Sequence, residues 1–200
     1  MLHPALPGWP GEPGFALRAS ARIGADCPVN TAAVTLSTHA GTHADAPLHY
    51  DAAGTDSAQT ALDAYIGACV VLDVRGCGVR IEAHHVAWDA IGEVKRVLFR
   101  TYERFPHDAW DDASTAIAPE VIERLGAIGV VLVGTDSASL DPQGSKTMDA
   151  HLAVRRHGMR ILEGLVLDAV APGEYELIAL PLPIAGADAS PVRAVLRTLG

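Results

Sequence analysis

Short apolar runs, separated by polar and glycine-containing segments, mark the strands that this sequence predicts. Residues 68–74 and 130–133 are continuous apolar runs, and runs of this length are typical of strands buried on both faces of a sheet. Residues 33–37 alternate apolar and polar side chains, which also predicts a strand. We predict three further strands, at residues 94–102, 161–170 and 175–182.

Helical spacing of apolar side chains predicts helices between these strands. Residues 119–125 begin with proline, which is tolerated in the first turn of a helix. Residues 148–156 are followed by Gly158, a residue type that commonly ends helices. Residues 81–91 have helical spacing as well, so we expect a third helix there.

The order of these elements indicates the fold class. Buried strands alternate with short helices, which predicts an α/β fold, and 200 residues suit a single domain over residues 1–200. Residues 191–199 fit either an edge strand or a short helix. Residues 1–15 are rich in proline and glycine and should form a loop.

Composition narrows the classes of function and the expected location. The formal net charge of -9 disfavours nucleic acid and anionic membranes as partners. The three cysteines show no CxxC pair, which suggests free thiols in a reducing compartment; they are Cys27, Cys69 and Cys77. No leader is evident and no apolar run reaches about 18 residues, so we expect a soluble cytoplasmic protein.

Several common catalytic motifs are missing from the sequence. There is no GxGxxG or GxxxxGK[ST] pattern, so no loop for a nucleotide phosphate is indicated. There is no GxSxG pattern of the kind that presents a nucleophilic serine in α/β hydrolases. The chemistry must therefore come from other residues.

Residues 39–49 carry the strongest chemical signal, because His39, His43, Asp45 and His49 fall within this short segment. Imidazole nitrogen and carboxylate oxygen are the usual ligands of zinc and similar divalent ions. On a straight strand the first two histidines would lie roughly 13 Å apart, too far to share an ion. Gly41 and the proline at position 47 argue against a regular helix, so we expect a bent loop with three ligands around one ion and His49 beyond it.

Other residues also invite a choice between a chemical and a structural interpretation. With nine histidines in the chain, some could cluster by chance. Glu163 lies in an apolar stretch, where it either meets a cation or points outward from an edge strand. His151 is either a ligand or a surface histidine. Trp9, between proline and glycine residues, either packs on the body or forms the wall of a pocket for a flat ligand.

The pattern H-x-G-T-H-x-D-x-P-x-H in residues 39–49 resembles the signature of the cyclase-like metal-dependent hydrolases, and within them the kynurenine formamidase branch. Four other segments share the resemblance, which covers nearly the whole chain: residues 134–141, 145–151, 160–165 and 186–193. The resemblance implies a cyclase-like fold, with a mixed, barrel-like sheet flanked by short helices. It also implies a homodimer and hydrolysis of N-formyl-L-kynurenine to L-kynurenine and formate.

The resemblance implies a role for each candidate residue. His39, His43 and Asp45 would hold one divalent metal ion, and Asp45 would bridge to a second, completed by His151 and Glu163. Zinc is the metal that we expect at both positions. His49 would be the acid/base, and Trp9 would contact the substrate. Two alternatives stay open: a hydrolase of another cyclic or aryl amide, such as isatin, and a non-catalytic metal-binding protein. A closed structural zinc site has no spare base, whereas His49 lies beyond the ligands.

Overall fold

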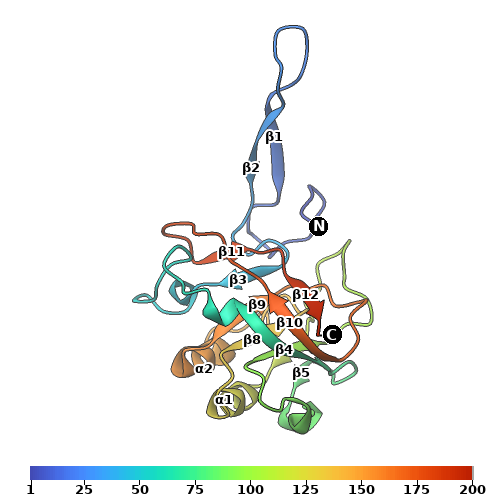
Figure 1. Ribbon diagram of the computed structural model, residues 1–200, viewed down its shortest axis with the longest axis vertical. Coiled ribbons are helices and arrows are strands. Elements are labelled where there is room, and N and C mark those ends of the chain that lie inside the picture. The colour runs from blue at the N-terminus through green and yellow to red at the C-terminus, as the bar shows by residue number, and fades with distance from the viewer. Residues whose placement is uncertain (200) are drawn as a thin grey trace.

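An eight-stranded mixed sheet runs through the computed structural model, which describes residues 1–199 (Figure 1). Its strand order is β11-β3-β9-β8-β6-β4-β10-β12. The four central strands are parallel to one another, and two antiparallel strands extend the sheet on each side. The strands are β3 (His43–Asp45), β4 (Ile66–Asp73), β6 (Arg96–Arg100), β8 (Leu132–Thr135), β9 (Arg160–Glu163), β10 (Gly173–Ile178), β11 (Ala189–Pro191) and β12 (Val195–Thr198).

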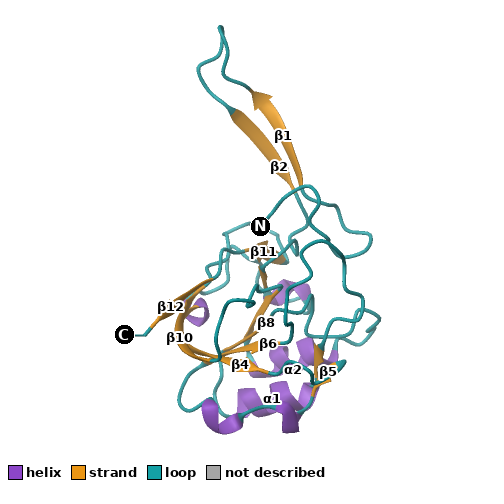
Figure 2. Cartoon of the chain, turned by 90° about the vertical axis from the view of Figure 1, so that its right-hand side faces the viewer, coloured by secondary structure: helices purple, strands orange, loops and turns teal. Residues whose placement is uncertain are grey.

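Both faces of the central strands are buried, as their continuous apolar runs predict. In β6, Val97 and Phe99 belong to the core cluster that includes the helix residues, whereas Leu98 belongs to the cluster on the opposite face. The two helices, α1 (Pro119–Ala127) and α2 (Asp149–His157), cover the first of these faces (Figure 2). The sheet is curled, so the expected α/β fold with a barrel-like mixed sheet is confirmed.

Most of the predicted elements are present with shifted ends. Helix α1 begins at Pro119, and Gly158 ends α2 in the left-handed conformation, as expected. Strand β9 stops at Glu163 instead of continuing to residue 170, because Gly164 turns the chain with φ of 61°. The ambiguous segment 191–199 contains an edge strand, β12.

The helix expected over residues 81–91 is wrong. The segment instead forms two short 3-10 turns, η3 (Ala83–His85) and η4 (Trp88–Ala90), and enters a small two-stranded sheet of β5 (Arg80–Ile81) with β7 (Ala116–Ile117). The Trp88 indole donates a hydrogen bond to the carbonyl of Ala83, and the Arg124 guanidinium lies 3.8 Å from the Trp88 ring centroid. A local hydrogen bond and a contact with α1 thus hold the segment in short turns, against its helical spacing.

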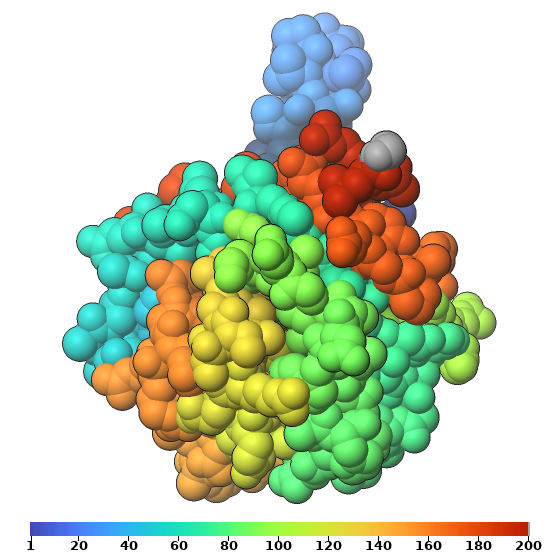
Figure 3. All heavy atoms as spheres, turned by 60° about the horizontal axis from the view of Figure 1, so that its bottom comes forward, coloured from blue at the N-terminus to red at the C-terminus, as the bar shows by residue number. Residues whose placement is uncertain are grey.

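A long hairpin arm projects from the body (Figures 1 and 3). It consists of β1 (Ala16–Ala21) and β2 (Thr31–Thr35), which pair antiparallel with each other as a sheet separate from the eight-stranded one. The strand predicted at 33–37 therefore lies largely in this arm, and its partner β1 was not predicted. Nearly every arm residue is exposed, so burial supplies no periodic signal there.

None of the helices formed by residues 1–199 has the length and apolar character that a membrane crossing requires. The short helices α1 and α2 lie on the sheet instead.

A close backbone contact joins the end of β9 to the turn that precedes β3. A side-chain Cβ at Gly164 would lie 2.6 Å from the carbonyl oxygen of Gly41, and Thr42 Oγ1 donates a hydrogen bond of 2.7 Å to the carbonyl of Gly164. Both glycines have positive φ, 66° at Gly41 and 61° at Gly164. The positive φ favours glycine at both positions, and the close approach to Gly41 additionally requires it at position 164.

Replacing Gly164 with alanine should therefore destabilise the protein. We expect Gly164→Ala to lower the free energy of unfolding by about 1–3 kcal/mol, because it adds backbone strain and a clash with Gly41. Gly144→Ala is the matched control, since a Cβ there meets no atom within 4 Å. Denaturant unfolding of both variants measures the difference; equal stabilities would contradict the contact.

Candidate metal centre

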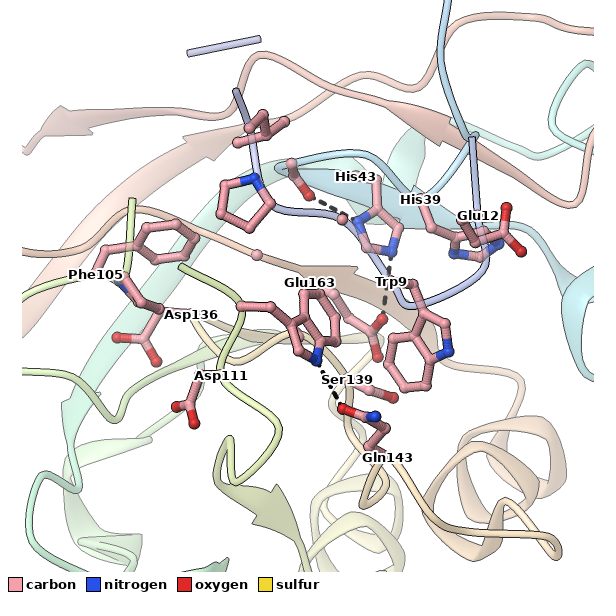
Figure 4. Close-up of a pocket in the computed structure, with 18 of the residues that line it drawn as sticks. Trp9, Glu12, His39, His43, Phe105, Asp111, Asp136, Ser139, Gln143 and Glu163 are labelled. Carbon is pink, nitrogen blue, oxygen red and sulfur yellow. Dashed lines mark hydrogen bonds and ion pairs between the residues drawn. The ribbon is translucent and has the colours of Figure 1, made fainter. Parts of the chain in front are cut away.

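Strand pairing brings the first three site residues together. His43 and Asp45 are two residues apart on β3, so their side chains point to the same face. Glu163 is the residue directly opposite His43 in the antiparallel pair of β3 and β9. His43 Nε2 lies 3.3 Å from Glu163 Oε2 (Figure 4). It also lies 3.4 Å from Asp45 Oδ1. All three side chains are almost completely buried.

The turn before β3 adds His39. Gly41 bends the chain here, as expected, and its carbonyl accepts a hydrogen bond of 2.9 Å from Nδ1 of His43. His39 Nδ1 lies 3.2 Å from Asp45 Oδ1. The predicted bent loop is therefore correct for residues 39–42, whereas the segment from His43 to Asp45 is a regular strand.

Helix α2 supplies His151. This side chain is fully buried, so the alternative that His151 is a surface histidine is wrong. Its Nε2 lies 3.3 Å from Asp45 Oδ2 and 3.5 Å from Glu163 Oε1. Its Nδ1 lies 2.6 Å from Asp141 Oδ2, and the Asp141 carboxylate also accepts bonds from the backbone N–H groups of Ala150 and His151. Asp141 thus fixes both the start of α2 and the orientation of the imidazole.

The three histidines share one arrangement. Each holds one ring nitrogen against an oxygen outside the centre, from Gly41, Asp141 or Asp188, and directs the other nitrogen at Asp45. An imidazole anchored in this way presents a free nitrogen of fixed direction, which is how metal-ligating histidines are usually oriented.

The donor atoms also fit a cation, because two buried atoms in the centre have no hydrogen-bond partner. They are His43 Nε2 and Asp45 Oδ1. Buried polar atoms almost always have a hydrogen-bond partner or a bound ion. A divalent cation would accept a lone pair from each of these two atoms. The residues present therefore fit a metal ion.

Asp45 stands between two groups of donors. Its Oδ1 faces His39 and His43, whereas its Oδ2 faces His151. The donor atoms of His39, His43 and Asp45 all lie within 4.8 Å of one another, as do those of Asp45, His49 and His151. Glu163 reaches both sides, through Oε2 to His43 and Oε1 to His151.

Charge pairing dominates the electrostatics of the centre. Burial lowers the pKa of His43, but the nearby carboxylates of Asp45 and Glu163 outweigh burial and raise the pKa to about 10. Burial also lowers the pKa of His151, but its hydrogen bonds to Asp141 and Asp45 outweigh burial and raise the pKa to about 10. Burial alone would raise the pKa of Asp45, yet the three histidines hold it well below its usual value. The buried carboxylate is anionic and is balanced by protons that a metal ion would displace on binding.

His49 lies at the edge of this group. It ends the turn η1 (Pro47–His49), its side chain is 26% exposed, and its ring centroid lies 4.4 Å from that of His39 and 5.6 Å from that of His151. Asp188 Oδ2 lies 3.4 Å from His49 Nδ1 and 3.2 Å from His39 Nε2. One carboxylate thus contacts both an inner histidine and the more accessible one.

A cavity of about 300 Å³ opens onto the centre, where His39, His43 and Glu163 line it (Figure 4). His49 lines the cavity as well. Aromatic side chains form much of the remaining wall: Trp9, Tyr102, Phe105 and Trp110. The rings of Trp9 and Trp110 meet edge to face with centroids 5.3 Å apart, and Trp110 donates a hydrogen bond to Gln143. Trp9 therefore lies where its pocket interpretation requires, half-buried against a second tryptophan.

Two carboxylates of the site, Asp141 and Asp188, were not predicted. Both lie in segments that carry the family resemblance, but neither follows a spacing rule, since Asp188 is 139 residues from His49 and Asp141 is 10 residues from His151 across a turn. Ser137, two residues after β8, is fully buried, and its hydroxyl lies 3.2 Å from that of Thr101.

Comparison with known proteins places these features in a family. A sequence profile described as putative cyclase matches residues 1–142. Proteins named kynurenine formamidase from Sphingopyxis alaskensis and Maricaulis maris are 59% and 57% identical over 198 residues, 99% of this chain and 95% of each relative. A solved structure described as a potential metal-dependent hydrolase with cyclase activity is 26% identical, with a TM-score of 0.83 and coverage of 98% of this chain and 93% of that one. Isatin hydrolase A from Labrenzia aggregata is 25% identical, with a TM-score of 0.80 and coverage of 98% and 90%.

The position of Glu163 yields a test of metal binding. Glu163→Gln keeps the size of the side chain but removes a buried anionic donor, so divalent metal affinity should fall by more than about tenfold. Zinc titration followed by elemental analysis measures this, and circular dichroism checks the fold. Glu120→Gln, on the exposed side of α1, is the control; metal binding unchanged in both variants would exclude Glu163 as a ligand.

Proposed function

The chain belongs to the putative cyclase family, and on that basis we propose that it hydrolyses the formamide bond of N-formyl-L-kynurenine. Water adds to the formyl carbon, the carbon–nitrogen bond breaks, and L-kynurenine and formate leave. Identity of 52–59% over nearly the whole chain to relatives named kynurenine formamidase is the observation that carries this proposal. An aromatic-lined cavity that opens onto a metal centre suits an aryl amide.

We assign the metal ligands as two sets that share Asp45. His39, His43 and Asp45 would hold one divalent ion, and Asp45, His151 and Glu163 the other, with zinc the best match for imidazole and carboxylate donors. Metal ions bound by these residues would supply Lewis acidity, which can lower the pKa of water from about 15.7 toward 7 and polarise a carbonyl oxygen.

His49 is proposed as the acid/base. It borders the ligands, is accessible from the cavity, and is held by Asp188 through Nδ1, which leaves Nε2 for the reacting groups. Imidazole titrates near neutrality, so it can take a proton from the attacking water and return it to the departing nitrogen. An arylamine leaves poorly without that proton.

The aryl ring of the substrate would lie against Trp9. This side chain comes from the N-terminal loop and meets Trp110 across the cavity wall, so a flat ring can pack on it close to His39 and His49. Packing on Trp9 would place the formamide group at the metal centre.

The exposed arm supports the expected homodimer. Leu17 and Val34 are register partners, so they share a face, and they are 61% and 52% exposed. An isolated two-stranded hairpin is at best marginally stable in water, and its apolar face needs a covering surface. A second copy of this chain would provide one. The cytoplasmic location expected from the sequence stays a prediction.

Turnover of N-formyl-L-kynurenine, followed by the absorbance of kynurenine, tests the proposed reaction directly. Isatin, assayed in parallel on the same zinc-loaded protein, tests the alternative substrate. We expect the formamide to be hydrolysed with a much larger kcat/KM than isatin. The opposite ranking would favour the isatin-hydrolase alternative, and no turnover of either would favour a non-catalytic metal protein.

Loss of His49 should cost turnover but not metal. His49→Ala should lower kcat on the order of 10²- to 10⁴-fold, the usual contribution of one positioned acid/base, while zinc content is retained. His39→Ala should lose both, and His84→Ala, an exposed histidine, should lose neither. Zinc content and kcat are measured on the same preparations; loss of zinc in His49→Ala would make His49 a ligand instead.

The arm makes a prediction about assembly. Leu17→Lys combined with Val34→Lys should shift the protein from dimer to monomer, because it places charges on the face that a partner would cover. Sedimentation velocity measures the masses. Val79→Lys, at an apolar side chain that is 77% exposed on the body, is the control and should leave the dimer intact. A monomeric wild-type protein would contradict the dimer itself.

A further inference from the structure

The cavity must accommodate the two charged groups of the substrate of the proposed reaction. Beyond its aryl ring it carries an ammonium and a carboxylate group. Among the described residues that line the cavity there is no lysine or arginine, whereas four carboxylates line it: Glu12, Asp111, Asp136 and Glu163. A wall with carboxylates and without lysine or arginine can form ion pairs with the ammonium group of the substrate but not with its carboxylate.

Three of these carboxylates are unsuited to that role. Glu163 belongs to the metal centre. Asp136 is buried, and its oxygens are occupied by the backbone N–H groups of Thr101 and Tyr102 and by the Thr101 hydroxyl. Glu12 is exposed on the N-terminal loop, where water competes for its charge.

Asp111 differs from the others because it is both oriented and incompletely used. Tyr102 donates its hydroxyl to Asp111 Oδ2 at 2.7 Å, and the backbone N–H of Ala113 donates to Oδ1 at 3.0 Å. Each carboxylate oxygen can accept two hydrogen bonds, so each retains one free position. Asp111 is half-buried and lines the cavity (Figure 4), directly after Trp110 in the sequence.

Tyr102 is a dependable donor for this purpose. Burial, together with its bond to Asp111, raises the pKa of the Tyr102 hydroxyl above its usual value, so it stays protonated and keeps Asp111 in place. A carboxylate fixed in advance loses little conformational entropy when it binds a cation.

We propose that Asp111 binds the ammonium group of the amino-acid end of the substrate and so determines the preference for amino-acid formamides over simple aryl formamides. This assignment rests on the proposed reaction. The metal centre and Trp9 would act on the aryl formamide part, which is common to both kinds of substrate, whereas Asp111 would contact only the part that differs.

The test uses two substrates on the zinc-loaded full chain: N-formyl-L-kynurenine, and its analogue in which hydrogen replaces the ammonium group. For the first, Asp111→Asn should raise KM with little change in kcat, lowering kcat/KM about 10- to 100-fold, the range for a hydrogen bond to a charged group. For the analogue, the variant and the wild type should have the same kcat/KM. Asp112→Asn removes the neighbouring exposed carboxylate and should change neither.

Tyr102→Phe provides a second variant that leaves the charge in place. It removes the hydroxyl that orients Asp111 and should raise KM selectively for the ammonium-bearing substrate, by less than Asp111→Asn does. Equal losses on both substrates, or no loss on either, would overturn the role of Asp111. A wild-type protein that hydrolyses neither substrate would instead overturn the proposed reaction, so the two failures are distinguishable.

Discussion

The antiparallel register of β3 and β9 is the constraint on which the site depends. It sets His43 opposite Glu163, and the two-residue period of β3 then places Asp45 on the same face. A slip of one residue would turn both β3 side chains to the other face of the sheet. The contact of Gly164 with Gly41 opposes such a slip, because a residue with a side chain in place of Gly164 would clash with the Gly41 carbonyl.

Charge in this centre is compensated in two layers. Asp45 is completely buried, and burying an unpaired carboxylate would be very costly, so three histidines surround it. Outside them, Asp141, Asp188 and the carbonyl of Gly41 hold the far nitrogens of those histidines. The helix α2 is tied to the same layer, since Asp141 also accepts hydrogen bonds from its first N–H groups.

The sequence predicts the parts of this protein whose signal is local. Apolar runs identify β4, β6 and β8. A proline at the start of α1 and a glycine after α2 identify the two helices, and the histidine-rich segment identifies the donors of residues 39–49. The pairing of His151 with Asp141 and of His49 with Asp188 depends on tertiary packing, so composition and spacing could not supply it. Strand β1 of the arm was not predicted for a related reason, because it is exposed and has no buried face that would impose a pattern on its sequence.

The order of the site residues along the chain bears on how the protein is made. Contacts within the centre join residues 106 positions apart for Asp45 and His151, and 149 positions apart for His39 and Asp188. Non-local contacts of this kind form late and slow the folding of a domain. During synthesis, the histidines of residues 39–49 emerge from the ribosome long before Asp188 does. The outer support of the centre therefore cannot form until the segment that contains Asp188 has been synthesised.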